Sequence, residues 1–132
     1  MTAVDDLILI VEDNERNRRL VRDLLQVSGF TTIEAQDACN GLALAAEHVP
    51  ALILMDIQLP DVDGVTALHR LRADSRTAGI PVVAVTAFAM STDRQRLLDA
   101  GFDAYVEKPI DIKTFPAQVR ALVGRRVAGG AP

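Results

Sequence analysis

The sequence contains one cysteine, Cys39, and no tryptophan among its 132 residues. A single cysteine cannot form an intramolecular disulfide, and without a CxxC pair or a Cys/His cluster the chain offers no zinc or redox motif. Cys39 follows a predicted helix start and has no obvious activating base, so we interpret it as a packing residue. The absence of a disulfide framework favours a reducing compartment, and we expect the protein to be cytoplasmic.

Long hydrophobic runs and an excess of positive charge are also missing. No apolar stretch approaches the roughly 20 residues that a membrane helix needs, and residues 1–6 lack the features of a signal peptide. The formal net charge of −4 argues against a nucleic-acid-binding surface. The most basic stretch contains Arg16, Arg18, Arg19 and Arg22, which we interpret as a solvated helix surface rather than a docking patch. The sequence therefore predicts neither a membrane nor a nucleic-acid partner.

Short apolar runs alternate with amphipathic stretches along the chain. The runs are continuous, as in parallel strands buried on both faces, and the stretches between them have the three-to-four apolar spacing of helices. Strands are predicted over 7–11, 30–35, 52–55, 80–85 and 103–107, and helices between Asn14 and Ser28, from 38 to before Pro50, and over 65–73, 89–100 and 112–123. This order predicts an α/β fold, a flavodoxin-like (βα)5 three-layer sandwich whose parallel five-stranded sheet has the order 2-1-3-4-5. We expect one domain over residues 5–124 and a flexible C-terminal tail over 125–132.

Polar side chains follow four of the predicted strands at the point where each strand ends. Glu12 and Asp13 follow the first strand, Asp56 the third, Thr86 the fourth and Lys108 the fifth. Because the carboxyl ends of parallel strands meet at one edge of a sheet, we expect these side chains to share a pocket. Three carboxylates beside a hydroxyl and an ammonium group predict a site for a cation and a phosphate.

Each of these residues also has a simpler explanation. Asp13 could cap a helix, Asp56 could be a turn residue, Thr86 could serve only its strand and Lys108 could face solvent. Their joint occurrence at successive strand ends favours a site. Crowding Glu12, Asp13 and Asp56 is unfavourable without a cation, and oxygen ligands suit Mg²⁺. A carboxylate can attack phosphorus, while Lys108 and Thr86 can contact phosphoryl oxygens.

Five short motifs lie in a fixed order along the chain. They are Val11-Glu12-Asp13-Asn14, Met55-Asp56-Ile57-Gln58-Leu59-Pro60, Asp63-Gly64, Val85-Thr86-Ala87 and Lys108-Pro109. In this combination they resemble the receiver domains of response regulators, the CheY-like superfamily, over essentially residues 5–124. The resemblance implies a role in two-component phosphorelay signalling rather than as an enzyme acting on other substrates.

The resemblance also assigns roles to particular residues. Asp56 would accept a phosphoryl group from a histidine kinase or phosphotransfer protein. Glu12, Asp13, Asp56 and the backbone carbonyl of Gln58 would hold Mg²⁺ as the cofactor. The signalling receiver would catalyse only its own phosphorylation and dephosphorylation.

The resemblance further implies a conformational switch. Thr86 and Lys108 would bind the phosphoryl oxygens, and Thr86 and Tyr105 would move upon phosphorylation. Tyr105 could instead be a half-buried residue of an edge strand that takes no part in switching. The peptide bond between Lys108 and Pro109 is expected to be cis, as in the family.

Within the superfamily, Met55 to Pro60 and Thr86 to Met90 look most like single-domain DivK-type regulators and the receivers of hybrid kinases. Since no output domain is expected after Val123, the signal would pass to a protein partner through the face around Ala87 to Tyr105, and a homodimer is possible. Phe88 on that face could also pack inward.

Two alternative functions remain open. A haloacid-dehalogenase-like phosphatase also uses an aspartate nucleophile, but it needs a second aspartate two residues later, where this chain has Gln58. A scaffold receiver would bind partners without phosphorylation, although such a protein need not keep all the groups of the site. The dependence of partner binding on phosphorylation would distinguish signalling from scaffolding.

Overall fold

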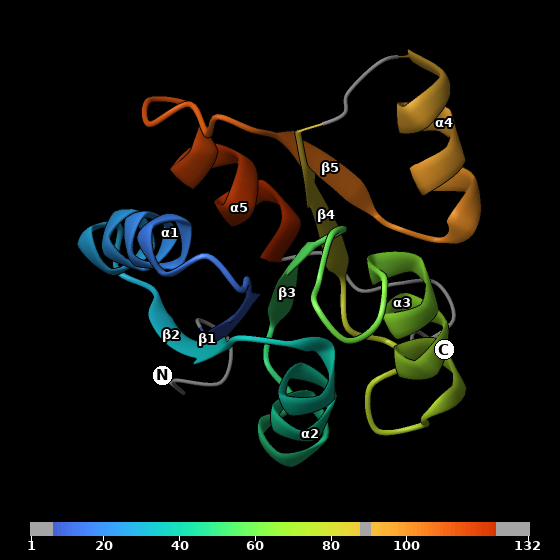
Figure 1. Cartoon of the computed structure of the whole chain (residues 1–132). Coiled ribbons are helices and arrows are strands. Elements are labelled where there is room, and N and C mark those ends of the chain that lie inside the picture. Colours follow the sequence, from blue (N-terminus) through green and yellow to red (C-terminus); the bar gives the residue numbers. More distant parts are fainter. Residues whose placement is uncertain (1–6, 88–90, 124–132) are drawn as a thin grey trace.

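The computed structural model describes residues 7–87 and 91–123, which form a parallel five-stranded sheet with helices on both faces (Figure 1). The strand order β2-β1-β3-β4-β5 confirms the predicted flavodoxin-like topology. The strands are β1 (Leu7–Val11), β2 (Thr31–Ala35), β3 (Leu52–Asp56), β4 (Val82–Thr86) and β5 (Ala104–Glu107); the helices are α1 (Glu15–Val27), α2 (Ala38–His48), α3 (Gly64–Ala73), α4 (Ser91–Ala100) and α5 (Phe115–Val123). In the described part of the chain, none of the helices has the length and apolar character needed to cross a membrane.

Within the described residues, two predicted element starts differ from the structure by more than one residue. β4 begins at Val82, two residues later than predicted, because Pro81 has no backbone N–H to donate to the sheet. α5 begins at Phe115, three residues later than predicted. The chain first makes a turn in which the Asp111 carboxylate accepts a hydrogen bond from the backbone N–H of Lys113 at 2.9 Å. The predicted start of the fourth helix and the predicted tail over 125–132 lie outside the described residues.

The sheet separates two hydrophobic clusters. Successive strand residues point to opposite faces, so β1 sends Leu9 and Val11 to one cluster and Ile8 and Ile10 to the other. Helices α2, α3 and α4 contribute to the first cluster, and α1 and α5 contribute to the second. Figure 1 shows α1 and α5 together on one side of the sheet. The strands are therefore buried from both sides, and only their ends are available for a site.

Side chains at the carboxyl edge of the sheet begin three of the helices. Asn14, Asp37 and Asp63 each accept a hydrogen bond from the backbone N–H three residues later, at 3.0, 2.8 and 2.9 Å. Such caps satisfy N–H groups that have no partner within the helix. Because each cap directly follows a strand or its loop, the helix starts are fixed around the same edge.

Val49 ends α2 in a conformation that valine disfavours. Its φ of 46° lies in the left-handed region, where a β-branched side chain is strained. We expect Val49→Asn to raise the free energy of unfolding by about 1 kcal/mol, since asparagine tolerates this conformation. Chemical denaturation would measure the change, with Val49→Ala as the control that keeps an unfavourable residue there. An unchanged or lowered stability of Val49→Asn would contradict the strain.

Candidate functional site

The five predicted polar residues lie at the carboxyl edge of the sheet. Glu12 and Asp13 directly follow β1, Asp56 ends β3, Thr86 ends β4 and Lys108 directly follows β5. Glu12, Asp56 and Thr86 are only 5%, 5% and 4% exposed, whereas Asp13 is exposed to solvent. The strand ends are also bonded to one another, since the backbone N–H of Lys108 donates to the carbonyl of Thr86 at 2.8 Å. The predicted convergence is therefore present.

The ammonium group of Lys108 bridges two buried carboxylates. Its Nζ atom lies 3.0 Å from Oε1 of Glu12 and 3.0 Å from Oδ2 of Asp56. Burial disfavours the charged lysine, but its hydrogen bonds to Asp56 and Glu12 outweigh this and raise the pKa of Lys108 above its usual value. One cation therefore serves two anions that would otherwise repel each other.

Glu12 carries the strongest electrostatic perturbation at the site. Burial, together with its hydrogen bond and charge repulsion with Asp56, raises the pKa of Glu12 to about 7. The backbone N–H of Asn14, which donates to Oε2 at 3.1 Å, acts in the opposite direction. Near neutral pH, a positive charge added beside Glu12 would therefore favour its ionised form, with the proton released to water.

Asp56 is held in a fixed orientation by the loop that follows it. Its Oδ1 accepts a hydrogen bond from the backbone N–H of Gln58 at 2.9 Å, while Oδ2 faces Lys108. Gly64 closes this loop by donating its N–H to the carbonyl of Ile57 at 2.9 Å. A Cβ atom at Gly64 would lie 2.9 Å from the Ile57 Cα, so only glycine fits this approach. Gly64 thus supports the position of Asp56.

Glu12, Asp13 and Asp56 form an acidic group suited to a metal ion. Each offers a carboxylate oxygen, and these oxygens all lie within 4.8 Å of one another. Hard divalent cations such as Mg²⁺ take oxygen ligands and retain several waters, for which the exposed side of Asp13 leaves room. The donor set therefore fits Mg²⁺.

The family follows from sequence comparison. Residues 8–120 match the model of the response regulator receiver domain. The chain belongs to this family. It is 46% identical over 117 residues to the polar-differentiation response regulators DivK of Brucella anthropi and Brucella ovis, covering 89% of this chain and 95% of each relative. It is thus a receiver domain of a two-component signalling protein.

Solved receiver structures agree with this fold. The receiver domain of a sensor histidine kinase from Pseudomonas aeruginosa superimposes with a TM-score of 0.83 at 30% identity, covering 91% of this chain and 98% of that one. That structure has a magnesium ion coordinated in its active-site cleft. A CheY-like receiver from Methanospirillum hungatei gives a TM-score of 0.81 at 28% identity, covering 90% of this chain and 94% of its own.

The receiver's predicted output face is partly described. Tyr105 on β5 is half-buried, and the guanidinium of Arg94 lies over its ring at 5.5 Å from the centroid. Arg94 also lies 4.0 Å from the carboxylate of Glu107. Tyr105, Arg94 and Glu107 contribute to a hollow of about 310 Å³ between α4 and α5. Phe88 lies outside the described residues, so its predicted alternatives stay open.

Two sequence interpretations of the receiver are wrong. Cys39, in the first turn of α2, is exposed rather than packed, and the buried residues of that helix are Ala38, Gly41 and Ala45. Arg16 and Arg19 are exposed as predicted, but Arg18 is not part of a solvated surface. Its side chain is 11% exposed and pairs with Glu34 of β2. That contact joins elements 16 residues apart in the chain, which helix spacing alone could not show.

Asp61 makes contacts to α2 that the sequence did not predict, since it indicated only a turn at this position. Its carboxylate accepts hydrogen bonds from the backbone N–H groups of Ala38 and Cys39, both at 2.9 Å. These bonds to the start of α2 lower the pKa of Asp61 below its usual value. The receiver's loop after Asp56 is therefore attached to a second helix as well as to α3.

Proposed function

We propose that this receiver accepts a phosphoryl group on Asp56 from a phosphohistidine of a kinase or phosphotransfer protein. The observation that carries the proposal is the arrangement of Asp56 itself. Its carboxylate stands at the end of the central strand β3, with one oxygen fixed by the N–H of Gln58 and the other beside the ammonium group of Lys108. A nucleophile held in this way needs little reorganisation before it attacks phosphorus.

The transfer exchanges one bond to phosphorus for another. An oxygen of Asp56 forms a bond to phosphorus as the phosphorus–nitrogen bond of the donor histidine breaks, and the leaving nitrogen keeps that electron pair. Lys108 then pairs with a phosphoryl oxygen, and the hydroxyl of Thr86 donates a hydrogen bond to another. The product is an acyl phosphate on Asp56, and attack by water later reverses the modification.

Glu12, Asp13, Asp56 and the backbone carbonyl of Gln58 would hold Mg²⁺ in this proposal. The ion would supply positive charge to the phosphoryl oxygens during transfer. The chain provides the carboxylates, two of which are already close to one ammonium group. The support is the oxygen donor set of this chain and the magnesium ion in the related kinase receiver.

Intact-protein mass spectrometry with acetyl phosphate tests the proposed acceptance. We expect a single phosphoryl adduct in the presence of Mg²⁺ and none when EDTA removes the ion, because Lys108 alone does not offset the repulsion between three carboxylates and an incoming phosphoryl anion. Phosphohistidine on a kinase or phosphotransfer protein would serve as the second donor. No adduct from either donor with Mg²⁺ present would contradict the proposal.

A thermal melt tests the proposed metal site separately. At a Mg²⁺ concentration tenfold above the dissociation constant, we expect the ion to stabilise the wild type by about 1.4 kcal/mol. Asp13→Asn removes one carboxylate and relieves part of the repulsion, so its metal-free melting temperature should be higher and its response to Mg²⁺ should disappear. Ca²⁺-free and Mg²⁺-free melts of both proteins provide the baseline. An undiminished Mg²⁺ response in Asp13→Asn would place the ion elsewhere.

We further propose that phosphorylation moves Thr86 and Tyr105 and so changes the affinity of the face around residues 87–105 for a downstream protein or a second copy of this chain. The support is that the ring of Tyr105 is half-buried beside Arg94, a position from which the ring could turn inward. Partner affinity measured with and without phosphorylation tests this step. Equal affinities would favour the scaffold alternative instead.

A further inference from the structure

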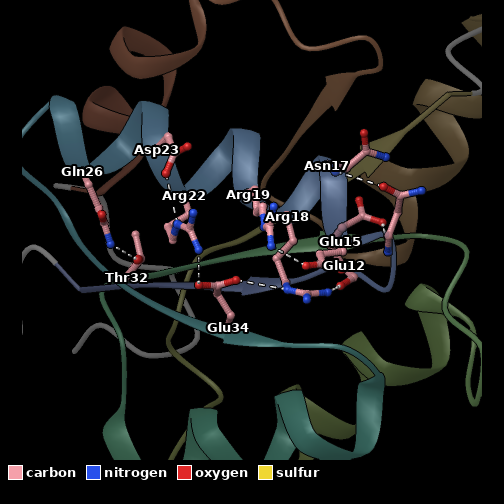
Figure 2. A network of polar contacts seen from close by, with 11 residues as sticks. Glu12, Glu15, Asn17, Arg18, Arg19, Arg22, Asp23, Gln26, Thr32 and Glu34 are labelled. Atoms are coloured by element: carbon pink, nitrogen blue, oxygen red, sulfur yellow. Dashed lines mark hydrogen bonds and ion pairs between the residues drawn. The ribbon is translucent and has the colours of Figure 1, made fainter.

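Arg18 has a largely buried side chain close to Glu12, and the proposed phosphoryl transfer gives this side chain no role. It lies in the second turn of α1, and its side chain is only 11% exposed. Figure 2 shows its guanidinium between α1 and the two strands beneath it, close to Glu12 and Glu34. Arginine is rarely buried to this extent unless its donors are paired. Its partners therefore indicate what it does.

The guanidinium of Arg18 connects two strands. Its Nε donates to Oε1 of Glu34 on β2 at 3.1 Å, and its Nη1 donates to the backbone carbonyl of Glu12 at 2.9 Å. Because the guanidinium is planar and rigid, fixing Nε also fixes the direction of Nη1. Glu34 thus aims Arg18 at the end of β1.

The Glu12 carbonyl, which Arg18 contacts, belongs to the peptide group that joins Glu12 to Asp13. The N–H of Glu12 still donates to the carbonyl of Ala35 on β2 at 3.0 Å, as in the sheet. Beyond it, the peptide plane that contains the Glu12 carbonyl also contains the N–H of Asp13. Holding this carbonyl fixes the plane between the two acidic residues and, with it, the directions in which their side chains leave the backbone.

We propose that Arg18 is a positioning residue for Mg²⁺ binding: clamped by Glu34, it holds the peptide plane that joins Glu12 and Asp13. This inference rests on the proposed metal site. Arg18 acts through the backbone and touches neither the metal nor the phosphoryl group. Its removal should weaken metal binding without removing any ligand.

Arg22 offers a matched control on the same helix. It also reaches Glu34, with its Nη1 3.7 Å from Oε2, and it contacts Asp23 at 3.1 Å. Both arginines are drawn with Glu34 in Figure 2. Arg18, not Arg22, bonds the Glu12 carbonyl. Arg22→Met therefore removes the same charge and a contact to the same glutamate while the proposed clamp stays in place.

Isothermal titration with Mg²⁺ alone compares the variants. We expect the dissociation constant of Arg18→Met to rise about tenfold, as for other residues that orient metal ligands, and that of Arg22→Met to stay within about twofold of the wild type. Arg18→Lys should lie between the wild type and Arg18→Met, since lysine can replace the charge but not the rigid two-directional contact. A folded Arg18→Met with wild-type affinity would overturn the proposal.

A second readout separates positioning from general damage. In acetyl phosphate reactions, Arg18→Met should need more Mg²⁺ for half-maximal phosphorylation, while its rate at saturating Mg²⁺ returns close to that of the wild type. A rate that stays low at saturating Mg²⁺, with unchanged half-saturation, would overturn the positioning role. Melting curves without metal establish that each variant is folded.

Glu34→Gln keeps the test decisive if Arg18→Met does not fold. It loosens the clamp while leaving the arginine in place, so a smaller rise in the Mg²⁺ dissociation constant is expected, and no rise would overturn the proposal. A wild type that binds no Mg²⁺ would contradict the proposed metal site itself. Wild-type binding that Arg18→Met or Glu34→Gln leaves unchanged would contradict only the role of Arg18.

Discussion

Asp56→Asn is expected to abolish phosphorylation while leaving the fold intact. Asparagine has nearly the same shape as aspartate and can still accept the hydrogen bond from the N–H of Gln58. It lacks the nucleophilic carboxylate oxygen, and its neutral side chain removes one charge from the acidic group. Intact-protein mass spectrometry after incubation with acetyl phosphate and Mg²⁺ should therefore show no adduct, and circular dichroism should match that of the wild type.

Asp63→Asn is the control for this experiment. Asp63 belongs to the same loop but caps α3 through the N–H of Thr66, and asparagine caps helices about as well. This variant should take up one phosphoryl group as the wild type does. An adduct on Asp56→Asn would move the acceptor to another residue, and loss of the adduct in both variants would point to damage to the loop.

Lys108→Met is expected to reduce both stability and phosphorylation. The side chain of Lys108 neutralises Glu12 and Asp56, which are 5% exposed each, so its removal leaves two buried carboxylates without a cation. At pH 8 without Mg²⁺, the free energy of unfolding should fall by about 2–3 kcal/mol, because removing one partner of a buried ion pair is costly. The initial phosphorylation rate should fall about a hundredfold, as when a donor to the transition state is lost.

The stability loss in Lys108→Met should shrink as the pH falls from 8 to 6. The pKa of Glu12 in the folded protein, about 7, already lies above its ordinary value of 4.5. The folded state then binds more protons than the unfolded state between these values, so Glu12 contributes stability that grows as pH falls through 7. Without the ammonium group of Lys108, burial and Asp56 should raise the pKa of Glu12 further, which widens the pH range over which the folded state binds more protons than the unfolded state.

Denaturant titrations at pH 8 and pH 6 without metal measure this dependence. Lys113→Met is the control, because Lys113 is exposed in the turn before α5 and its side chain does not pair with Glu12, Asp13 or Asp56. We expect Lys113→Met to behave as the wild type at both values. A Lys108→Met protein as stable as the wild type at pH 8 would show that the two carboxylates do not depend on the lysine.

The position of the site could be predicted because it depends on topology. Continuous apolar runs identified strands buried on both faces, and strands of that kind imply a parallel sheet with its polar residues at one edge. Glu12, Asp56, Thr86 and Lys108 needed only that rule to be placed together. Residue chemistry predicted a site for Mg²⁺ and a phosphate there, whereas the full set of metal ligands and the choice of Asp56 as acceptor came from resemblance, and both remain proposals.

Contacts between distant elements could not be predicted in this way. Arg18 is indistinguishable from Arg16 and Arg19 on sequence charge alone, and only the register of β2 places Glu34 where Arg18 can reach it. Asp61 follows a proline in turn-forming sequence, yet its partners belong to the start of α2, 22 and 23 residues away. Local pattern predicted that these residues were polar and near loops, but their partners depend on the assembled fold.

The two hydrophobic clusters have a consequence for how such a protein diverges. Strand side chains that face α1 and α5 do not contact those that face α2, α3 and α4, because the sheet lies between them. Substitutions on one side should thus add to those on the other with little coupling. Changes in the cluster beneath α1 and α5 and changes in the cluster beneath α2, α3 and α4 can therefore accumulate along separate mutational paths, and the two sides of the molecule can evolve at different speeds.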